Sequence, residues 1–160
     1  MKILIIGGVA GGATAAARLR RNDENAEIVL IERGPYVSFA NCGLPYHLSG
    51  AIADREQLLV ATADLFRNRY RVDVRPLTEA IAIDRAAKTV RLRHRETGVE
   101  IDESYDRLLL SPGAEPVKPP LPGIDSAKVT TLRTVADAVA LRERVAGDAA
   151  ARRAVVLGAG

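Results

Sequence analysis

The sequence predicts an α/β fold in which a parallel sheet is joined by an antiparallel β-meander. Three observations predict it. Residues 2–6 form an apolar run that leads through a glycine cluster into an alanine-rich stretch. Residues 28–31 are apolar throughout, as expected of a parallel strand that is covered on both faces, and residues 105–110 (YDRLLL) are predicted to form another buried strand. Residues 78–105 instead alternate apolar and polar side chains with period two, which is typical of antiparallel strands.

A strand–turn–helix opens the chain, with the helix expected from Ala10 to Arg21. The glycines of its turn are Gly7, Gly8, Gly11 and Gly12. Such a turn lets a dinucleotide pyrophosphate lie on the helix N-terminus, where free backbone N–H groups and the helix dipole favour negative charge. Val9 replaces the second glycine of the G-x-G-x-x-G fingerprint, so the fingerprint by itself is weak. Glu32 strengthens it, because an acid at the end of the second strand can bond a ribose hydroxyl. The alternative is a tight turn that binds nothing.

A second apolar strand is expected at residues 154–157, and it is followed by Gly158 and Gly160. This pattern is the opening of another nucleotide-binding turn. Because the sequence stops inside that turn, we expect the chain to be the front part of a longer protein.

Composition excludes several classes of protein. The formal net charge is only +3 and aromatic residues make up 4%, which argues against nucleic-acid binding. No apolar run approaches the ~18–20 residues of a membrane-spanning helix. The single cysteine, Cys42, excludes an intramolecular disulfide and points to a reducing compartment, so we expect a cytoplasmic protein. We predict no metal site.

The elements between these motifs follow from local signals. Thr62 is a good N-cap for a helix through about Tyr70, and a strand follows at 72–74. The meander has its turns near 84–87 and 96–98. Its apolar face is expected to hold Ile81, Ile83, Val90 and Leu92, and its solvated face to hold Arg91, Arg93 and Arg95.

The last third of the chain contains a linker and one helix. Five prolines between residues 112 and 125, without a helical period, indicate a linker. Thr134 is expected to cap a helix that continues through about Val145.

Residues 33–50, RGPYVSFANCGLPYHLSG, contain the only cysteine among turn-forming and small polar residues. Pro45 favours the start of a short helix, which would place Cys42 just before it, where unsatisfied N–H groups favour a thiolate. Ser38 and Asn41 are candidates to bond a ligand or to cap this helix. The alternative for Cys42 is a small buried hydrophobe.

Arg18 and Arg21 are three residues apart and therefore share one face of the first helix. Helical spacing alone favours a solvated helix end, whose cations complement the dipole, over an anion contact. Further arginines follow at positions 67, 69 and 71.

Together these motifs resemble the flavin-dependent pyridine nucleotide–disulfide oxidoreductases. They resemble in particular the single-cysteine branch with coenzyme A-disulfide reductase, NADH oxidase/peroxidase and persulfide reductases, a branch that Val9 suits. The stretches that carry the resemblance are IIGGVAGGATAAARLRR, IER, SFANCGLPYHLSG, YDRLLLSPGAEP, TLRTVADA and VVLGAG. The resemblance implies a Rossmann-like, glutathione-reductase-type FAD-binding domain, of which residues 1–111 are the N-terminal part. Residues 112–152 are then a Pro-rich linker and connecting helix, and 153–160 the first strand of an NAD(P)H-binding domain.

The resemblance also implies a mechanism. Electrons pass from NAD(P)H through FAD to Cys42 as the catalytic residue, and on to a disulfide or persulfide. The FAD-binding residues implied are Gly7, Gly8, Val9, Ala10, Gly11, Gly12, Glu32, Arg33, Asn41, Cys42, Ser111 and Gly113. The residues implied to line a site for coenzyme A, or for another low-molecular-weight thiol or disulfide, are Arg18, Arg21, Ser38 and Asn41. The arginines at 67–71 are weaker candidates for its phosphates.

Cys42 has no partner at the C-x4-C spacing of the family's dithiol members, because Val37 and His47 occupy those positions. The thiol must then pair with a small molecule or cycle through sulfenic acid. NADH oxidase or peroxidase activity stays open as an alternative, as does a non-catalytic nucleotide-binding fragment. The resemblance further implies that the full-length protein is a homodimer and that the 160 residues alone are inactive, because a later segment completes the FAD domain.

Overall fold

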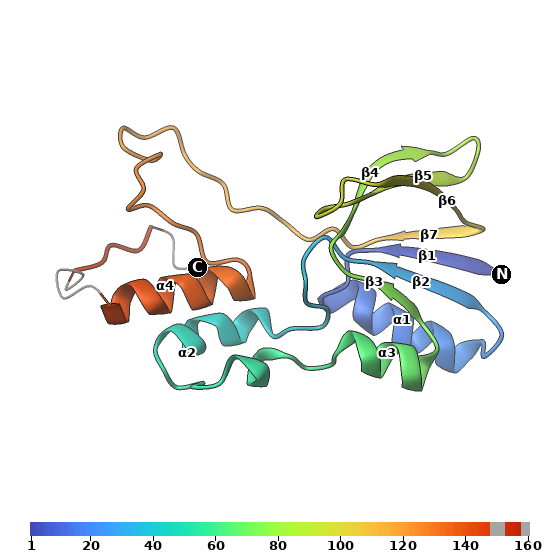
Figure 1. Cartoon of the computed structure of the whole chain (residues 1–160), viewed down its shortest axis with the longest axis horizontal. Coiled ribbons are helices and arrows are strands. Elements are labelled where there is room, and N and C mark those ends of the chain that lie inside the picture. Colours follow the sequence, from blue (N-terminus) through green and yellow to red (C-terminus); the bar gives the residue numbers. More distant parts are fainter. Residues whose placement is uncertain (148–152, 158–160) are drawn as a thin grey trace. The chain divides into compact units, whose positions relative to one another are not determined.

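The computed structural model describes residues 1–147 and 153–157, and the chain forms two compact units (Figure 1). The first unit comprises Met1–Ala40 and Leu59–Ala114. The second comprises Asn41–Leu58 and the chain from Glu115 onward. The stretch around Cys42 therefore groups with the C-terminal helix and not with the glycine turn.

A four-stranded parallel sheet forms the centre of the first unit, as predicted, with the strand order β3-β2-β1-β7. Its strands are β1 (Lys2–Ile6), β2 (Glu27–Ile31), β3 (Asp73–Arg75) and β7 (Arg107–Leu110). Helices α1 (Ala10–Asn22) and α3 (Ala63–Tyr70) cover one face of this sheet (Figure 1). The small side chains of Ala13 and Ala16 are buried there, which lets α1 pack closely against Ile3 and Ile5. The predicted N-cap of α3 is confirmed, since Thr62 Oγ1 accepts from Leu65 N–H at 3.2 Å.

The predicted meander covers the other face of the sheet. It consists of β4 (Thr78–Asp84), β5 (Thr89–His94) and β6 (Glu100–Ser104), all antiparallel. Val90 and Leu92 are both 0% exposed and pack on the apolar face of the parallel sheet. Arg91 and Arg93 face solvent, as expected, and form cross-strand ion pairs with Asp102 and Glu100.

The expected inward orientation is wrong for Ile81 but not for Ile83, which pairs with Val90 and so shares its face. The register of β4 against β5 shifts between Ala80 and Ala82. This bulge adds one residue to β4, so that Ala80 and not Ile81 packs with the buried cluster. Ile83 stands opposite Val90 but lies near the end of the strand and is 42% exposed.

A buried charge cluster joins the meander to the parallel sheet. The carboxylate of Glu103 on β6 is 9% exposed and forms ion pairs with Lys2 of β1 and Arg75 of β3. Burial opposes ionisation of Glu103, but the hydrogen bonds from Lys2 and Arg75 outweigh it and hold the pKa of this carboxyl below its usual value. The bond to Glu103 also raises the pKa of Lys2.

We expect Glu103→Gln to lower the free energy of unfolding at neutral pH by about 2–3 kcal/mol, because it leaves two cations beside a buried neutral group. A lowered pKa of Glu103 in the folded state means that this stabilisation is lost as pH falls through that pKa. Urea unfolding at pH 7 and at acidic pH should therefore show a deficit that shrinks on acidification. The matched control is Asp102→Asn on the same strand, whose exposed carboxylate pairs with Arg91. Equal losses in both variants would contradict the account.

The second unit contains short helical elements. These are the 3-10 helices η1 (Asn41–Gly43) and η2 (Arg55–Leu58), and the α-helices α2 (Leu44–Leu48) and α4 (Val135–Gly147). The predicted cap of α4 is confirmed as a reciprocal pair, since Thr134 Oγ1 accepts from Asp137 N–H and Asp137 Oδ2 accepts from Thr134 N–H. Residues 112–125 form neither helix nor strand, as expected of a linker.

The strand expected at 154–157 is not formed. Residues 153–157 have no regular structure, and Val155 is 94% exposed. A parallel strand needs a neighbouring strand to satisfy its backbone, and no strand of the described residues pairs with this segment. Gly158 and Gly160 lie outside the described residues. Among the residues described, no helix combines the length and the apolar character required to cross a membrane.

Candidate functional site

The turn between β1 and α1 requires glycine at two positions because backbone segments meet there. Gly7 has a φ of +95°, and a Cβ on it would lie 1.9 Å from the carbonyl oxygen of Ser111. A Cβ on Gly12 would lie 1.8 Å from the carbonyl oxygen of Gly7. These two glycines therefore permit the sharp turn and the close packing of α1 on β1.

The N-terminus of α1 is open to an anion. Val9 is its N-cap residue, no side chain caps it, and its first turn contains no acidic residue. Ala10 and Gly11 at its start are exposed. The first N–H groups of this 13-residue helix thus have no side-chain acceptor, and the helix dipole adds positive potential. Such an end fits a pyrophosphate.

Glu32 lies directly behind this turn, at the end of β2. Its side chain is buried, with 8% exposed. Oε2 accepts from Gly8 N–H at 2.8 Å, and Oε1 accepts from Gly34 N–H at 2.7 Å. A carboxylate has about four acceptor positions, so Glu32 retains capacity for a ribose hydroxyl while it holds the turn in place.

Ser111, which directly follows β7, also lies at the glycine turn. Ser111 N–H donates to the Ile6 carbonyl at 2.7 Å, and its Oγ lies 2.9 Å from where a Cβ on Gly11 would be. Gly113, further along, has a φ of +76°. The structure thus brings Ser111 to the glycine turn, whereas Arg33 is exposed beyond Glu32.

Cys42 is exposed, so the alternative of a small buried hydrophobe is wrong. It lies in η1, immediately before α2, and Pro45 occupies the first turn of α2 as expected. Beside it, Oδ1 of Asn41 is buried and has no hydrogen-bond partner among the described residues. A buried acceptor without a partner is rare in folded proteins and is the kind of atom that a ligand satisfies.

Ser38 belongs to the first unit and is held against the glycine turn. Its N–H donates to the Gly8 carbonyl at 2.9 Å, and its carbonyl accepts from Val60 N–H at the same distance. Its φ of +49° is unusual for a residue with a side chain. Such backbone strain is found most often at binding sites.

Arg18 and Arg21 are exposed, and neither makes a hydrogen bond or ion pair within the described part of the chain. Arg20 between them is different, because it donates to the carbonyls of Tyr70 and Arg71 and so ties α1 to the end of α3. Sequence patterning gave no signal for this role. Two of the arginines that follow residue 66 already have protein partners. Arg67 donates to Asp64 and to the Val74 carbonyl, and Arg71 donates to the Glu24 carbonyl.

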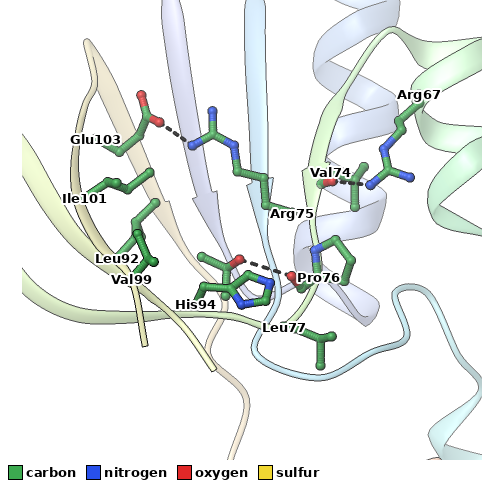
Figure 2. A pocket seen from close by; sticks show the side chains of 11 residues that line it. Arg67, Val74, Arg75, Pro76, Leu77, Leu92, His94, Val99, Ile101 and Glu103 are labelled. Atoms are coloured by element: carbon green, nitrogen blue, oxygen red, sulfur yellow. Dashed lines mark hydrogen bonds and ion pairs between the residues drawn. The ribbon is translucent and has the colours of Figure 1, made fainter. Parts of the chain in front are cut away.

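A cavity of about 640 Å³ lies in the first unit between β3, the start of β4 and the β5–β6 hairpin (Figure 2). Its walls are mainly apolar, and Arg67, a weaker candidate for phosphate binding, is the one sequence-predicted site residue of the described chain that lines it. Its buried charges are already paired, Arg75 with Asp73 and Glu103. No cluster of metal-ligating side chains occurs in the described ranges. One candidate site therefore remains in each unit, the glycine turn with Glu32 in the first and the Cys42 segment in the second.

The family model described as pyridine nucleotide-disulphide oxidoreductase matches residues 1–160. The coenzyme A disulfide reductase of Staphylococcus haemolyticus is 39% identical over 159 residues, which is 99% of this chain and 35% of that protein. The coenzyme A disulfide reductase of Staphylococcus aureus strain JH9 is 38% identical over 159 residues, again 99% of this chain and 35% of that protein. The chain thus spans about a third of the length of the curated relatives it matches.

Solved structures give the same result. Reduced Bacillus anthracis CoADR-RHD is 46% identical with a TM-score of 0.88, over 91% of this chain and 26% of that one. The NAD-dependent persulfide reductase from A. fulgidus is 37% identical with a TM-score of 0.87, over 92% of this chain and 28% of that one. The water-forming NADH oxidase from Lactobacillus brevis is 30% identical with a TM-score of 0.86, over 91% and 32%.

Proposed function

The chain belongs to the pyridine nucleotide-disulphide oxidoreductase family, and from this premise we propose that the full-length protein is a flavin-dependent NAD(P)H oxidoreductase that reduces a small-molecule disulfide through Cys42. The observation that carries the proposal is the exposed thiol of Cys42 beside the unpartnered Oδ1 of Asn41, in a chain with no second cysteine. Residues 1–111 are then the N-terminal part of an FAD-binding domain, and 153–160 begin the NAD(P)H-binding domain.

The residues of the first unit fit an adenine dinucleotide. The open N-terminus of α1 would hold the pyrophosphate of FAD, and the remaining acceptor positions of Glu32 would hold the ribose. When bound, FAD supplies the two electrons of NAD(P)H to the cysteine chemistry. Ser111 and Ser38 border the same turn and keep it in place through backbone hydrogen bonds.

The chemistry of Cys42 follows from its lack of a partner cysteine. Its thiolate attacks one sulfur of the substrate disulfide, the substrate S–S bond breaks, and the second sulfur leaves as a thiolate that takes up a proton. Cys42 is then in a mixed disulfide with the first half of the substrate. Two electrons and one proton release that half as a second thiol and restore the Cys42 thiolate.

Coenzyme A disulfide is the substrate that we propose, because two reductases of this disulfide are similar along nearly the whole chain. Arg18 and Arg21 support it, since both cations are exposed, have no partner among the described residues and suit a polyphosphorylated ligand. The interpretation of these arginines as a merely solvated helix end is the competing one.

We expect Arg18→Ala combined with Arg21→Ala to raise the KM for coenzyme A disulfide about tenfold or more in the full-length protein, because charge-assisted contacts to phosphate are lost. The KM for NAD(P)H should stay unchanged. Pantethine, a disulfide that lacks the nucleotide, should be reduced equally well by the variant and the parent. Arg91→Ala serves as the control, since it removes an exposed arginine from the meander. An unchanged KM for coenzyme A disulfide would contradict the assignment of these two arginines.

An NADH oxidase is the second candidate, and the likeness to the Lactobacillus brevis enzyme favours it. Cys42 would then cycle through sulfenic acid. Oxygen uptake with NADH, measured without any disulfide, separates the two functions. Rapid uptake with no release of thiol from coenzyme A disulfide would support the oxidase.

A further inference from the structure

The segment that carries Cys42 is too short to be stable alone. Together η1 and α2 span only Asn41–Leu48, whereas isolated helices shorter than ~12–15 residues are marginal in water. The position of the thiol must therefore be set by whatever packs against this segment. Within the second unit α4 packs against α2. Leu44 and His47 of α2 are buried, as are Val135 and Ala138 of α4.

Arg142 of α4 adds directed bonds to this packing. One terminal nitrogen of its guanidinium donates to the carbonyl of Ala53 at 2.8 Å and to the carbonyl of Ile52 at 3.3 Å. Ile52 N–H in turn donates to the Tyr46 carbonyl at 3.0 Å, so the chain after α2 folds back onto α2. Through these bonds Arg142 attaches α4 to the segment that begins with Cys42.

His47 of α2 bonds to one of the two carbonyls that Arg142 also contacts. Its ring is buried, with 4% exposed, and Nδ1 lies 2.8 Å from the Ile52 carbonyl. Because a carbonyl only accepts, Nδ1 carries the hydrogen and donates it. Arg142 approaches the same ring nitrogen at 3.1 Å, but both groups are donors there, so its hydrogens go to the two carbonyls. The Ile52 carbonyl thus accepts hydrogen bonds from both His47 and Arg142.

We propose that Arg142 is a positioning residue for Cys42, which fixes the Cys42-bearing segment to the helix that leads towards residues 153–157. This inference rests on the proposed function only for the role of Cys42 as the reacting thiol. The contact itself does not depend on that function. A shift of Cys42 by about 1 Å is enough to slow a reaction up to ~100-fold, so a bond that sets the place of this short segment matters for the rate.

Amide hydrogen exchange in the full-length protein tests the contact. The amides to follow are those of Ser49, Gly50 and Ile52, which donate to the carbonyls of Pro45, His47 and Tyr46. We expect Arg142→Met to speed their exchange about tenfold, because the local opening of this segment becomes easier. Arg144→Met is the matched control on the same helix, since Arg144 donates to Ala127 in the linker and not to the Cys42 segment. Equal exchange in the parent and in Arg142→Met would overturn the contact.

The rate of disulfide reduction tests the positioning. Arg142→Met should lower kcat about tenfold and leave the KM for NAD(P)H unchanged. Arg142→Lys, which keeps a donor, should recover most of the rate, and Arg144→Met should behave as the parent. Faster exchange with an unchanged kcat, or an equal loss of kcat in Arg144→Met, would overturn the positioning role. If Cys42→Ser keeps full activity, the proposed function fails, whereas the exchange result still decides the contact.

Discussion

Cys42→Ser is expected to abolish NAD(P)H-driven disulfide reduction by the full-length protein, with a loss of at least about 10³-fold. The variant keeps the size of the side chain but removes the one thiol of these 160 residues that can form a mixed disulfide. Cys42 is exposed, so the substitution should not disturb packing. Thiol release from coenzyme A disulfide, followed with a thiol reagent, measures the effect.

Two controls make this experiment decisive. The thermal unfolding midpoint and the flavin content of Cys42→Ser should equal those of the parent, since Cys42 is exposed. Glu56→Gln, an exposed change in the neighbouring η2, should leave the activity unchanged. Disulfide reduction at the parental rate by Cys42→Ser would rule out the thiol mechanism.

Gly12→Ala is expected to have the largest effect on the first unit. The added Cβ would lie 1.8 Å from the carbonyl oxygen of Gly7, and neither backbone can move without separating α1 from β1. We expect the free energy of unfolding to fall by at least about 3 kcal/mol and FAD to be lost on desalting. Urea unfolding and the visible absorbance of the full-length protein measure the two effects.

Gly147→Ala is the matched control for this substitution. Gly147 ends α4, and no atom lies within 4 Å of where its Cβ would be. The same chemical change should therefore be neutral or slightly stabilising there. A Gly12→Ala variant as stable as the parent would show that the turn is not packed as described.

The parallel sheet and the meander could be predicted because their signals are local. Residues 28–31 are apolar throughout, and residues 89–94 alternate strictly, so each run specifies its own strand type. The bulge near Ile81 could not be predicted, because nothing in an alternating run marks the extra residue. The strand expected at 154–157 failed because its apolar pattern specifies a strand only when a neighbouring strand is present.

Charged residues show more clearly that local sequence patterns do not predict contacts between distant segments. Glu103 lies in the polar run EIDES, which indicates an exposed strand, yet it is buried against Lys2 and Arg75. Its partners are 101 and 28 residues away, so only the folded sheet brings the three together. Arg20 and Arg142 likewise bond to distant backbone carbonyls, which no spacing rule reveals.

For the candidate site, the sequence predicts residue types but not their geometry. The glycines indicated a close approach to phosphate, whereas Gly7 and Gly12 are required by the carbonyls of Ser111 and Gly7 themselves. Glu32 was expected to bond a ribose hydroxyl, and in the structure it also accepts from the N–H groups of Gly8 and Gly34. The residue type signals the chemistry, while the packing around it depends on segments far along the chain.

The most direct test of the central claim, that Cys42 is a redox centre coupled to FAD, is an anaerobic reductive titration of the full-length protein after exposure to coenzyme A disulfide. Reduction of FAD and of a Cys42 mixed disulfide each takes two electrons, so we predict an uptake of about four electrons per FAD and release of one thiol. Cys42→Ser should take up about two electrons per FAD and release no thiol. An uptake of about two electrons by the parent would contradict the account.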